Sequence, residues 1–358
     1  MRHAQSGRLR IYLEGRKRDD LAAKVLTSEP GGKGAFEELT RVLDVPKLAF
    51  VINEMQDWCE PTTTVLGSFL QSMARVRGLP MGGAEQVLFA GNYAGTPFGV
   101  HRGYEHAFLF HLGPNPKSFY LWSPEQFREL TGSDEDVFDY QALLPHAVAL
   151  TLEPGDVLYL PALWFHIGMQ QTYSASVAVG LYDQPARFWL RNNLVPVLES
   201  LEASTERLSY ATPSLDANPF RAAVDEVSRH LLGEAIPDAL DDQWFRALSN
   251  GGFSTKLDRL SAVVPIDARS TVKLVEPFRV CWATRAVEGR IRIYLRGQRV
   301  TTRMHRALPS LLMVLGDGGS LALSEAIDRL GDQWAEDAVL GLFGALTRTG
   351  GLELLHTA

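Results

Sequence analysis

The segment between Lys47 and Asp183 constrains the fold more than any other part of this sequence. It contains a series of short runs rich in β-branched and aromatic residues, punctuated by Gly and Pro. Many short strands joined by tight turns are typical of an antiparallel sandwich or barrel. Apolar spacing predicts one helix within the series, at 63–77, and a short helix or loop at 124–132. The predicted strands are LAFVIN (48–53), QVLFAG (86–91), HAFLFHLG (106–113), SFYLW (118–122), AVALTLEPG (147–155), DVLYLPA (156–162) and SASVAVGLYD (174–183).

After the last of these strands the pattern changes to helix. Residues 188–208 show a long amphipathic repeat, and Asn218 is a suitable N-cap for a second helix that runs to Gly233. A third helix is predicted after Pro237. Because such helices cannot bury their apolar faces alone, we predict a packing or dimerisation layer and a homodimer.

The last part of the chain has a winged-helix-like order of strands and helices. Its charge argues against DNA binding, since residues from Arg303 onward include four Arg and seven Asp or Glu. Its third helix begins with Glu336 and Asp337, and an acidic recognition helix cannot bind the phosphates of DNA. We therefore predict a structural unit that binds no nucleic acid. The predicted strands are 278–283, 289–297 and 352–357, and the helices are 305–316, 321–331 and 336–350.

Two segments far apart in the sequence are nearly the same: GRLRIYLEG (7–15) and GRIRIYLRG (289–297) are identical at seven of nine positions. Similar alternation in two edge strands is the simpler explanation. A duplicated strand that binds an extended peptide by β-augmentation is the alternative. A single short match is weak evidence for a duplication, so we favour two edge strands with similar alternation.

Composition limits the class of protein. The formal net charge is -7, the pI is near 5.8, and no apolar run approaches the roughly 20 residues of a membrane-spanning helix. The basic N-terminus lacks the apolar core of a signal peptide. Cys59 and Cys281 are isolated, which indicates a reducing compartment without disulfides or structural zinc. We expect a soluble cytoplasmic protein without a membrane partner.

A first chemical motif runs from Gly155 to His166, with the sequence GDVLYLPALWFH. A Gly-Asp turn, a short apolar strand and Pro161 precede the histidine, which can point into the mouth of a barrel. The spacing resembles the second cupin motif, G-x5-P-x-G-x2-H, with Leu163 where that family has Gly. This resemblance implies a double-stranded β-helix that holds a metal.

A second motif, TPFGVHRGYE (96–105), precedes the strand AFLFHLG, Lys117 and the strand SFYLW. It resembles the cupin-like JmjC oxygenases, which include the bacterial ribosomal-protein hydroxylases. Their pattern is roughly F-G-x-H-x-D, a strand, G-x-K and a strand that ends near L-W. The resemblance covers about residues 85–183. It extends loosely to the C-terminus, because those hydroxylases carry a helical dimerisation layer and a winged helix.

The resemblance implies an enzyme that uses Fe(II), 2-oxoglutarate and O2 to oxidise C–H bonds. Two imidazoles and one carboxylate on one face leave open coordination positions for cosubstrate and oxygen. Carried over, His101 and His166 are the proximal and distal metal ligands, and Lys117 pairs with the far carboxylate of 2-oxoglutarate. Further hydroxyl partners of the cosubstrate would be Tyr93, Thr96 and Ser176.

The chain departs from this family at the carboxylate ligand, where it has Gly103. Strand alternation places residues 101, 103 and 105 on one face, so a gap is expected beside His101. Iron- and 2-oxoglutarate-dependent halogenases of a related fold have His-x-Gly or His-x-Ala, because chloride takes the carboxylate's coordination position. The His-x-Gly pattern therefore favours halogenation, with chloride as a further ligand.

Two alternatives remain open. Glu105 could replace the missing ligand, since His101-x3-Glu105-x7-Gly113 is close to the first cupin motif. A regular strand puts Glu105 about 13 Å from His101, but a bulge at Gly103 would shorten this distance. The enzyme would then be a hydroxylase. Otherwise no productive iron binds, and the barrel is an inactive peptide-binding module.

Other histidines near the motif have simpler explanations. His106 and His111 are expected to be packed or hydrogen-bonded core residues, and Trp164 and Phe165 are expected to wall the site. The sequence as a whole predicts an α+β chain: a cupin/JmjC double-stranded β-helix, a helical dimerisation layer and a winged-helix-like domain. The domains are expected at 1–185, 186–262 and 263–358. The predicted function is oxidation of an unactivated C–H bond in a peptide or protein side chain.

Overall fold

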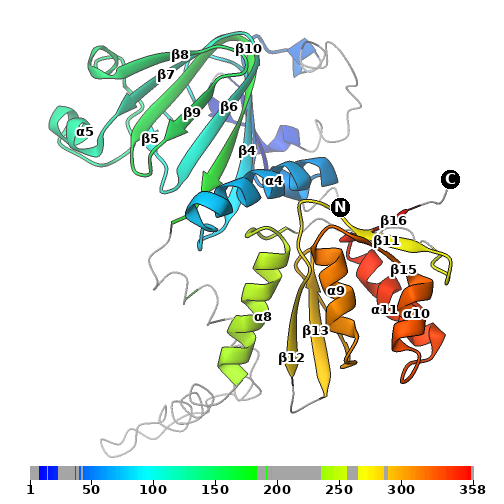
Figure 1. Cartoon of the computed structure of the whole chain (residues 1–358). Helices are drawn as coiled ribbons and strands as arrows, with labels where there is room; N and C mark the ends of the chain where they lie inside the picture. The colour runs from blue at the N-terminus through cyan, green and yellow to red at the C-terminus, as the bar shows by residue number, and fades with distance from the viewer. Residues whose placement is uncertain are drawn as a thin grey trace, which may run out of the picture. The chain divides into compact units, whose positions relative to one another are not determined.

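The computed structural model forms two compact units, one of residues 1–66 with 83–183 and one of residues 67–82 with 184–358. Helix α4 (Glu60–Arg77) runs through the boundary between them. Figure 1 labels the elements of both units. The structure describes residues 8–13, 15–22, 37, 40–41, 43–183, 191, 195, 235–255, 265–285 and 289–355.

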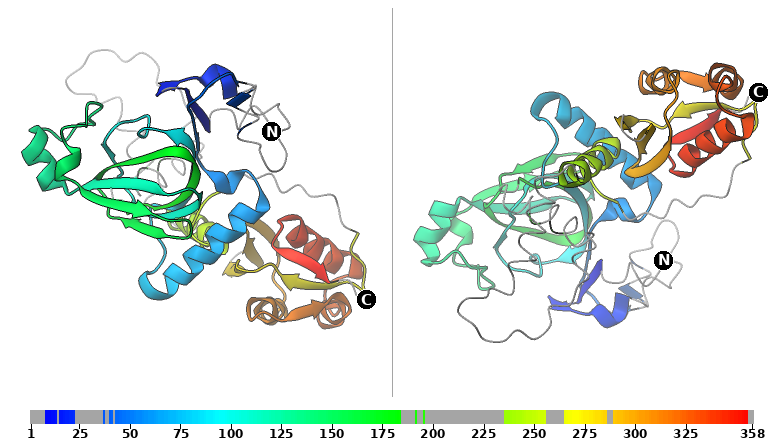
Figure 2. Two further views of the ribbon diagram at one scale, coloured as in Figure 1. Left: turned by 90° about the horizontal axis from the view of Figure 1, so that it is seen from above. Right: turned by 90° about the horizontal axis from the view of Figure 1, so that it is seen from below.

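Strand β10 (Phe165–Leu181) organises the first unit because its two ends pair in two different sheets. Its first residues pair with β5 (His101–Arg102) and β7 (Lys117–Trp122), and β7 pairs with β8 (Val148–Leu152). Its last residues pair with β4 (Ala84–Tyr93) and β6 (His106–Pro114), and β6 pairs with β9 (Val157–Leu160). All these pairs are antiparallel, and Figure 2 shows the two sheets facing one another. This is a double-stranded β-helix.

The sequence explains the packing between the two sheets. Inward-facing residues alternate along β6, where Ala107, Leu109 and His111 are buried. The apolar members pack against Phe119 of β7 and Leu160 of β9. Helix α5 (Pro124–Thr131) closes one end of the barrel through its only buried side chain, Phe127, with Ser123 as N-cap and Gly132 in the left-handed conformation after it.

The N-terminal part of the chain extends one sheet. Strand β1 (Leu9–Leu13) lies between β2 (Arg16–Lys17) and β3 (Leu48–Ile52), and β3 pairs with β4. The extension is close-packed, because a Cβ at Gly91 would collide with the carbonyl oxygen of Leu48. The described residues of the unit also form three short 3-10 helices: Asp19–Leu21, Met55–Asp57 and Leu144–His146.

Besides its part of α4, the second unit contains two three-stranded sheets and four helices within the described part of the chain. The helices are α8 (Ala235–Ser249), α9 (Leu308–Gly316), α10 (Leu323–Leu330) and α11 (Glu336–Arg348). The last three pack their apolar faces into one core around Leu312, Phe343 and Leu346, which are fully buried. In one sheet the strand order is β15 (Ser320–Ala322), β11 (Thr271–Leu274), β16 (Leu352–Leu355). In the other sheet it is β12 (Cys281–Arg285), β13 (Arg290–Leu295), β14 (Gln298–Arg303).

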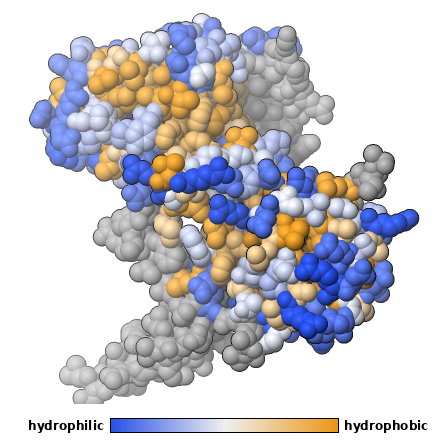
Figure 3. Space-filling view, viewed as in Figure 1, coloured by the Kyte–Doolittle hydropathy of each residue, from blue (hydrophilic) through white to orange (hydrophobic). Residues whose placement is uncertain are grey.

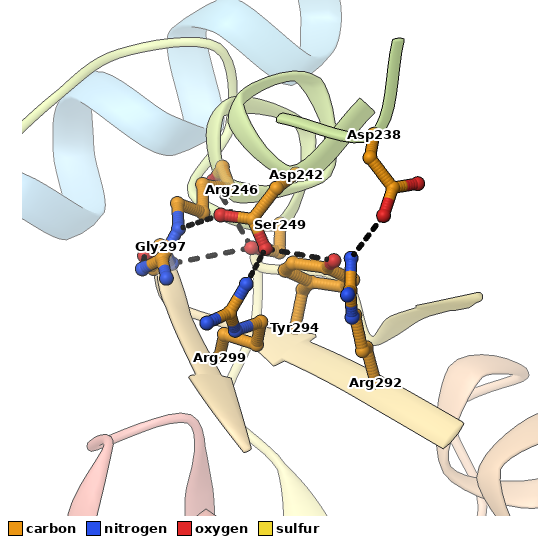
Figure 4. Close-up of polar contacts among 8 residues, drawn as sticks. All are labelled: Asp238, Asp242, Arg246, Ser249, Arg292, Tyr294, Gly297 and Arg299. Carbon is orange, nitrogen blue, oxygen red and sulfur yellow. Dashed lines mark hydrogen bonds and ion pairs between the residues drawn. The ribbon is translucent and has the colours of Figure 1, made fainter. Parts of the chain in front are cut away.

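Charged side chains connect α8 to the sheet of β12, β13 and β14 (Figure 4). Asp242 accepts hydrogen bonds from Arg299 at 2.7 Å and from the Tyr294 hydroxyl at 3.0 Å, and forms an ion pair with Arg246 at 2.7 Å. One turn earlier, Asp238 lies 3.4 Å from Arg292. This network is structural, since it joins a helix to the hairpin of β13 and β14.

Most elements agree with the sequence patterns. Each predicted strand of the first unit overlaps an observed one, and helix α8 begins two residues before Pro237. Of the helix predicted at 188–208 the structure describes only Arg191 and Val195, both helical, and the helix predicted at 218–233 lies outside the described residues. The α+β class is confirmed.

The expectation that the repeated segments are edge strands was wrong. Strand β1 pairs with β2 and β3, and β13 pairs with β12 and β14, so both have a neighbour on each side. Their common sequence instead suits an interior hairpin strand, in which Ile11 and Ile293 are fully buried.

Hydrophobic side chains gather on one face of the first unit in Figure 3, over the strands that Figure 1 labels β8 and β9. Val148, Leu150 and Val157 are among the exposed large hydrophobic residues there. Among the described helices of either unit, none is both long and apolar enough to span a membrane.

Candidate metal centre

His101 and His166 lie directly opposite each other on adjacent strands, β5 and β10. Their ring centroids are 4.4 Å apart. Phe98 packs edge-on against the His101 ring at 5.1 Å, and Phe119 stacks on the His166 ring at 5.6 Å. The sheet register and these two aromatic rings therefore hold both imidazoles beside one cavity.

Both histidines present the same nitrogen to that cavity. The Nδ1 atom of His101 lies 3.1 Å from the carbonyl oxygen of Gly99, and that of His166 lies 3.2 Å from the carbonyl oxygen of Trp164. A carbonyl can only accept, so each Nδ1 carries the proton and each Nε2 keeps a free lone pair. Metal-binding histidines in proteins use this arrangement.

Burial keeps the rings neutral. It lowers the pKa of His101, and it lowers the pKa of His166 to about 3, with the neighbouring His101 and Lys117 acting in the same direction. A neutral imidazole binds a metal without first losing a proton. The pair is therefore ready to act as two nitrogen ligands.

Two backbone positions shape the loops that carry the histidines. Gly99 has φ of 71°, and a Cβ there would collide with the carbonyl oxygen of Val137. Leu163 also has a positive φ, 69°, and its N–H donates to the carbonyl of Gly103 at 2.8 Å. The cupin pattern has Gly at the position of Leu163, and the observed backbone conformation is the one that favours glycine.

Gly103 makes room for a carboxylate. A Cβ at this position would lie 2.9 and 3.1 Å from the two carboxylate oxygens of Glu105 and 3.0 Å from its carboxyl carbon. A Cβ at Gly180, on β10, would lie 3.2 Å from Cγ of the same side chain. Glu105 thus lies in a cradle between two glycines, in the space beside His101 where an Asp at position 103 would project.

The local backbone explains this position. Strand β5 ends at Arg102, and the chain bends at Tyr104 and Glu105 before β6 begins at His106. The regular alternation that separates Glu105 from His101 by about 13 Å therefore does not apply here. Glu105 instead folds back over Gly103, and both line the same cavity as the two histidines.

The donor set fits a metal in part. Two neutral imidazoles with free Nε2 atoms and a carboxylate on one cavity wall are the chemistry that Fe(II) selects. Among the described residues, however, no three His, Cys, Asp or Glu side chains are gathered closely enough to hold one ion. Glu105 would have to rotate from its place against Gly103 to complete a set with His101 and His166.

The cavity has a volume of about 230 Å³ and lies entirely within the first unit. His101, His166 and Glu105 are at its wall, together with Gly103 and Lys117. Its remaining lining residues are Phe89, Thr96, Arg102, Tyr104, Ala107, Leu109, Phe119, Leu160, Pro161 and Ala178.

Lys117 is the buried cation of this cavity, with only 2% of its surface exposed. Its Nζ atom donates to the Tyr93 hydroxyl at 3.2 Å and to Oγ of Ser176 at 3.5 Å. Burial lowers the pKa of Lys117 to about 7. A buried ammonium without a carboxylate partner is costly, which makes the site receptive to an anion.

The three predicted hydroxyl partners differ in position. Thr96 lines the cavity, but its hydroxyl donates to the carbonyl of Gly99 at 3.2 Å, the same carbonyl that orients His101. Tyr93 and Ser176 contact Lys117 and are absent from the lining of this described cavity.

Sequence reasoning missed three features of the site. Gly180 completes the cradle of Glu105, and a Cβ at Gly168 would lie 2.8 Å from Cε of Lys117. His111 is a buried, hydrogen-bonded residue, as expected, but it contacts Ser176 at 3.0 Å. Because all three depend on pairing between strands distant in sequence, no local motif signals them.

Part of the chain matches a known family. Residues 117–187 match the family model described as JmjC domain, a range that includes Lys117 and His166 but begins after His101 and Glu105. The predicted resemblance to the JmjC family is therefore confirmed over this segment. The search of curated proteins gave no match.

Among solved structures, the chain is similar to YcfD of Escherichia coli. One X-ray structure of that protein is 17% identical, covers 97% of this chain and 87% of its own, and superposes with a TM-score of 0.53. Another, described as a ribosomal oxygenase in complex with cobalt and 2-oxoglutarate, is 14% identical, covers 86% and 79%, and has a TM-score of 0.46. At this level of identity the first likeness supports the fold, a cupin/JmjC double-stranded β-helix.

Proposed function

We propose that this chain is an Fe(II)- and 2-oxoglutarate-dependent oxygenase that hydroxylates a peptide or protein side chain. The observation that carries the proposal is the pair of opposed, neutral histidines with free Nε2 atoms, next to a carboxylate that fills the space beside Gly103. His101, His166 and Glu105 would hold the metal. Iron, 2-oxoglutarate and O2 would together supply the oxidising power that breaks an unactivated C–H bond.

The cavity residues would divide the remaining work. Lys117 would bind the far carboxylate of 2-oxoglutarate, since it is the buried cation that lines the cavity and its hydrogen-bond partners among the described residues are hydroxyls. Phe119 and Leu160 make part of the wall apolar, which excludes water and strengthens that ion pair. Thr96 would keep the Gly99 carbonyl in place, and through it the orientation of His101.

Chlorination is the second candidate, because the sequence reads His-x-Gly. The structure gives chloride less room than the motif implies, since the Glu105 carboxylate already lies against Gly103. A second anion there would meet like charge. The guanidinium of Arg102 lies over the Phe165 ring at 5.5 Å and 4.0 Å from Asp134, so its charge is balanced away from Gly103. We therefore place hydroxylation before halogenation.

A protein substrate is proposed by analogy. YcfD is described as a ribosomal oxygenase and has been crystallised with cobalt and 2-oxoglutarate or succinic acid. We propose that this chain likewise acts on a polypeptide. The homodimer and the cytoplasmic location expected from the sequence remain predictions, as does the absence of a nucleic-acid partner.

An inactive peptide-binding module is the alternative from a different class, and turnover separates it from an enzyme. The test is succinate formation from 2-oxoglutarate by the full chain with Fe(II) and O2, followed by mass spectrometry of offered peptides. We expect succinate from the wild type, none from His166→Ala, and a product that gains one oxygen atom. A product that gains chlorine would support halogenation, and a metal-loaded protein that forms no succinate would support the binding module.

A further inference from the structure

A chain of hydrogen bonds lies beneath Lys117 and leads away from the cavity. Ser176 is directly opposite His111 in the pairing of β10 with β6, and the two are 3.0 Å apart from Oγ to Nδ1. The other ring nitrogen of His111, Nε2, lies 2.8 Å from the carbonyl oxygen of Asn115. Ser176 is fully buried and His111 is 1% exposed, so neither group exchanges partners with solvent.

The direction of each proton follows from the end of this chain. The Asn115 carbonyl can only accept, so Nε2 of His111 carries a proton and donates it. In the neutral ring Nδ1 is then an acceptor, and the hydroxyl that faces it belongs to Ser176. The Ser176 proton therefore points at His111, and the lone pairs of its Oγ face Nζ of Lys117.

This arrangement determines how Lys117 meets a ligand. An ammonium group has three N–H donors. Two are taken by the oxygens of Tyr93 and Ser176, at 3.2 and 3.5 Å, and the third is left for the cavity that Lys117 lines. A Ser176 hydroxyl that was free to turn could donate toward Lys117 instead, which would repel the ammonium group.

The neighbouring sheet geometry supports this use of His111. A register shift between Ala175 and Ser176 skips Leu112, which is 59% exposed, and pairs Ser176 with His111. Irregularities of this kind are frequent next to active sites, where they redirect a side chain. Ser174, on the same strand, donates to the Asn115 carbonyl at 2.7 Å and so holds the end of the chain of hydrogen bonds in place.

We propose that His111 and Ser176 are positioning residues for the cosubstrate: His111 fixes the Ser176 hydroxyl as an acceptor, and Ser176 holds Lys117 with one N–H aimed at the distal carboxylate of 2-oxoglutarate. This deepens the proposed function and rests on it. It also revises the role expected for Ser176, which acts through Lys117 and does not contact the carboxylate itself.

The experiment compares two ligands of the metal-loaded protein: 2-oxoglutarate, and 2-oxobutanoate, which has the same 2-oxo acid group but no distal carboxylate. Their dissociation constants are measured anaerobically by calorimetry. We expect His111→Leu and Ser176→Ala to weaken 2-oxoglutarate about tenfold or more, with little change for 2-oxobutanoate, because only the distal contact is lost. His111→Gln keeps an acceptor and a donor on one planar group and should restore much of the difference.

Binding of 2-oxobutanoate by the same variants is the matched control, since this ligand has no distal carboxylate for Lys117 to contact. Equal losses for both ligands would overturn the positioning role. If His111→Leu does not fold, Ser176→Ala and His111→Gln decide the question. A wild type that binds the metal but not 2-oxoglutarate would refute the proposed function itself, whereas normal wild-type binding with unchanged variants would refute this inference alone.

Discussion

Replacing Glu105 by Ala tests whether this residue is the third metal ligand. The change removes the carboxylate that lies 2.9 to 3.1 Å from the position of a Cβ on Gly103. Loss of a residue that only supports a ligand already lowers metal affinity about 10- to 100-fold, so loss of the ligand itself should cost at least about 100-fold. The barrel should remain folded, because no other described residue forms a hydrogen bond with Glu105.

A carboxylate moved to position 103 should restore binding. The carboxyl carbon of an Asp lies one bond, about 1.5 Å, from its Cβ. The Glu105 carboxyl carbon lies 3.0 Å from the Cβ position of residue 103, so the two groups would compete for nearly the same space. Gly103→Asp alone should therefore bind metal poorly or displace Glu105, whereas the double variant Gly103→Asp/Glu105→Ala should recover much of the wild-type affinity.

The assay is anaerobic titration with Co(II) as a spectroscopic substitute for iron, read by its visible absorption. Glu85→Gln is the control for charge, since Glu85 lies close enough to Glu105 to interact electrostatically and instead accepts a hydrogen bond from Tyr182. We expect near-normal affinity in that variant. Wild-type affinity in Glu105→Ala, or no recovery in the double variant despite a native fold, would refute the assignment of Glu105.

Three further predictions concern the cavity and its rim. Gly168→Ala should raise the KM for 2-oxoglutarate severalfold with a smaller effect on metal affinity, because its Cβ would lie 2.8 Å from Cε of Lys117; equal changes in both would contradict this. The pKa of Lys117 is lowered by burial to about 7, so between pH 7 and its ordinary value of 10.5 the unfolded lysine binds a proton that the folded one does not. The free energy of unfolding should therefore rise across this range, by an amount on the order of a few kcal/mol, and Lys117→Met should remove the rise in chemical denaturation at pH 7 and pH 9.5. Leu163→Gly should leave stability unchanged or raise it by up to about 1 kcal/mol in thermal unfolding, because φ there is 69° and the side chain is 43% exposed; a loss greater than that would show that Leu163 packs.

The barrel was predictable because its signals are local. Apolar alternation, Gly and Pro between the runs, and the spacing from Gly155 to His166 all lie within short windows of sequence. The pairing of His101 with His166 also follows from the motifs, since both stand at the mouth of a barrel strand. The short strands β11, β14 and β15 were missed, because three to six residues carry too little periodicity.

The position of Glu105 was harder to predict, because two effects outweigh strand alternation. The chain bends immediately after β5, which ends the alternation at Arg102. The space that Glu105 fills is then provided by two glycines, Gly103 beside it and Gly180 on β10. The missing carboxylate at Gly103 thus predicted a chloride ligand, whereas in the structure the side chain of Glu105, two residues further along the chain, fills that space.

The roles around Lys117 depend on which groups donate and which accept. Sequence reasoning identified Tyr93 and Ser176 as hydroxyls near the cosubstrate, and both do contact Lys117. Their orientation depends on His111 and on the carbonyl of Asn115, through the pairing of β10 with β6. Such a chain of hydrogen bonds requires three-dimensional contacts that spacing does not reveal.

The most direct test of the central claim is the charge-transfer absorption of the anaerobic complex with Fe(II) and 2-oxoglutarate, recorded with and without chloride. A metal held by His101, His166 and Glu105 predicts a visible band in the wild type that chloride does not shift. The same band should be lost in His166→Ala and Glu105→Ala. A band that shifts with chloride and persists in Glu105→Ala would contradict the hydroxylase assignment, and a wild type without any band would contradict the metal site itself.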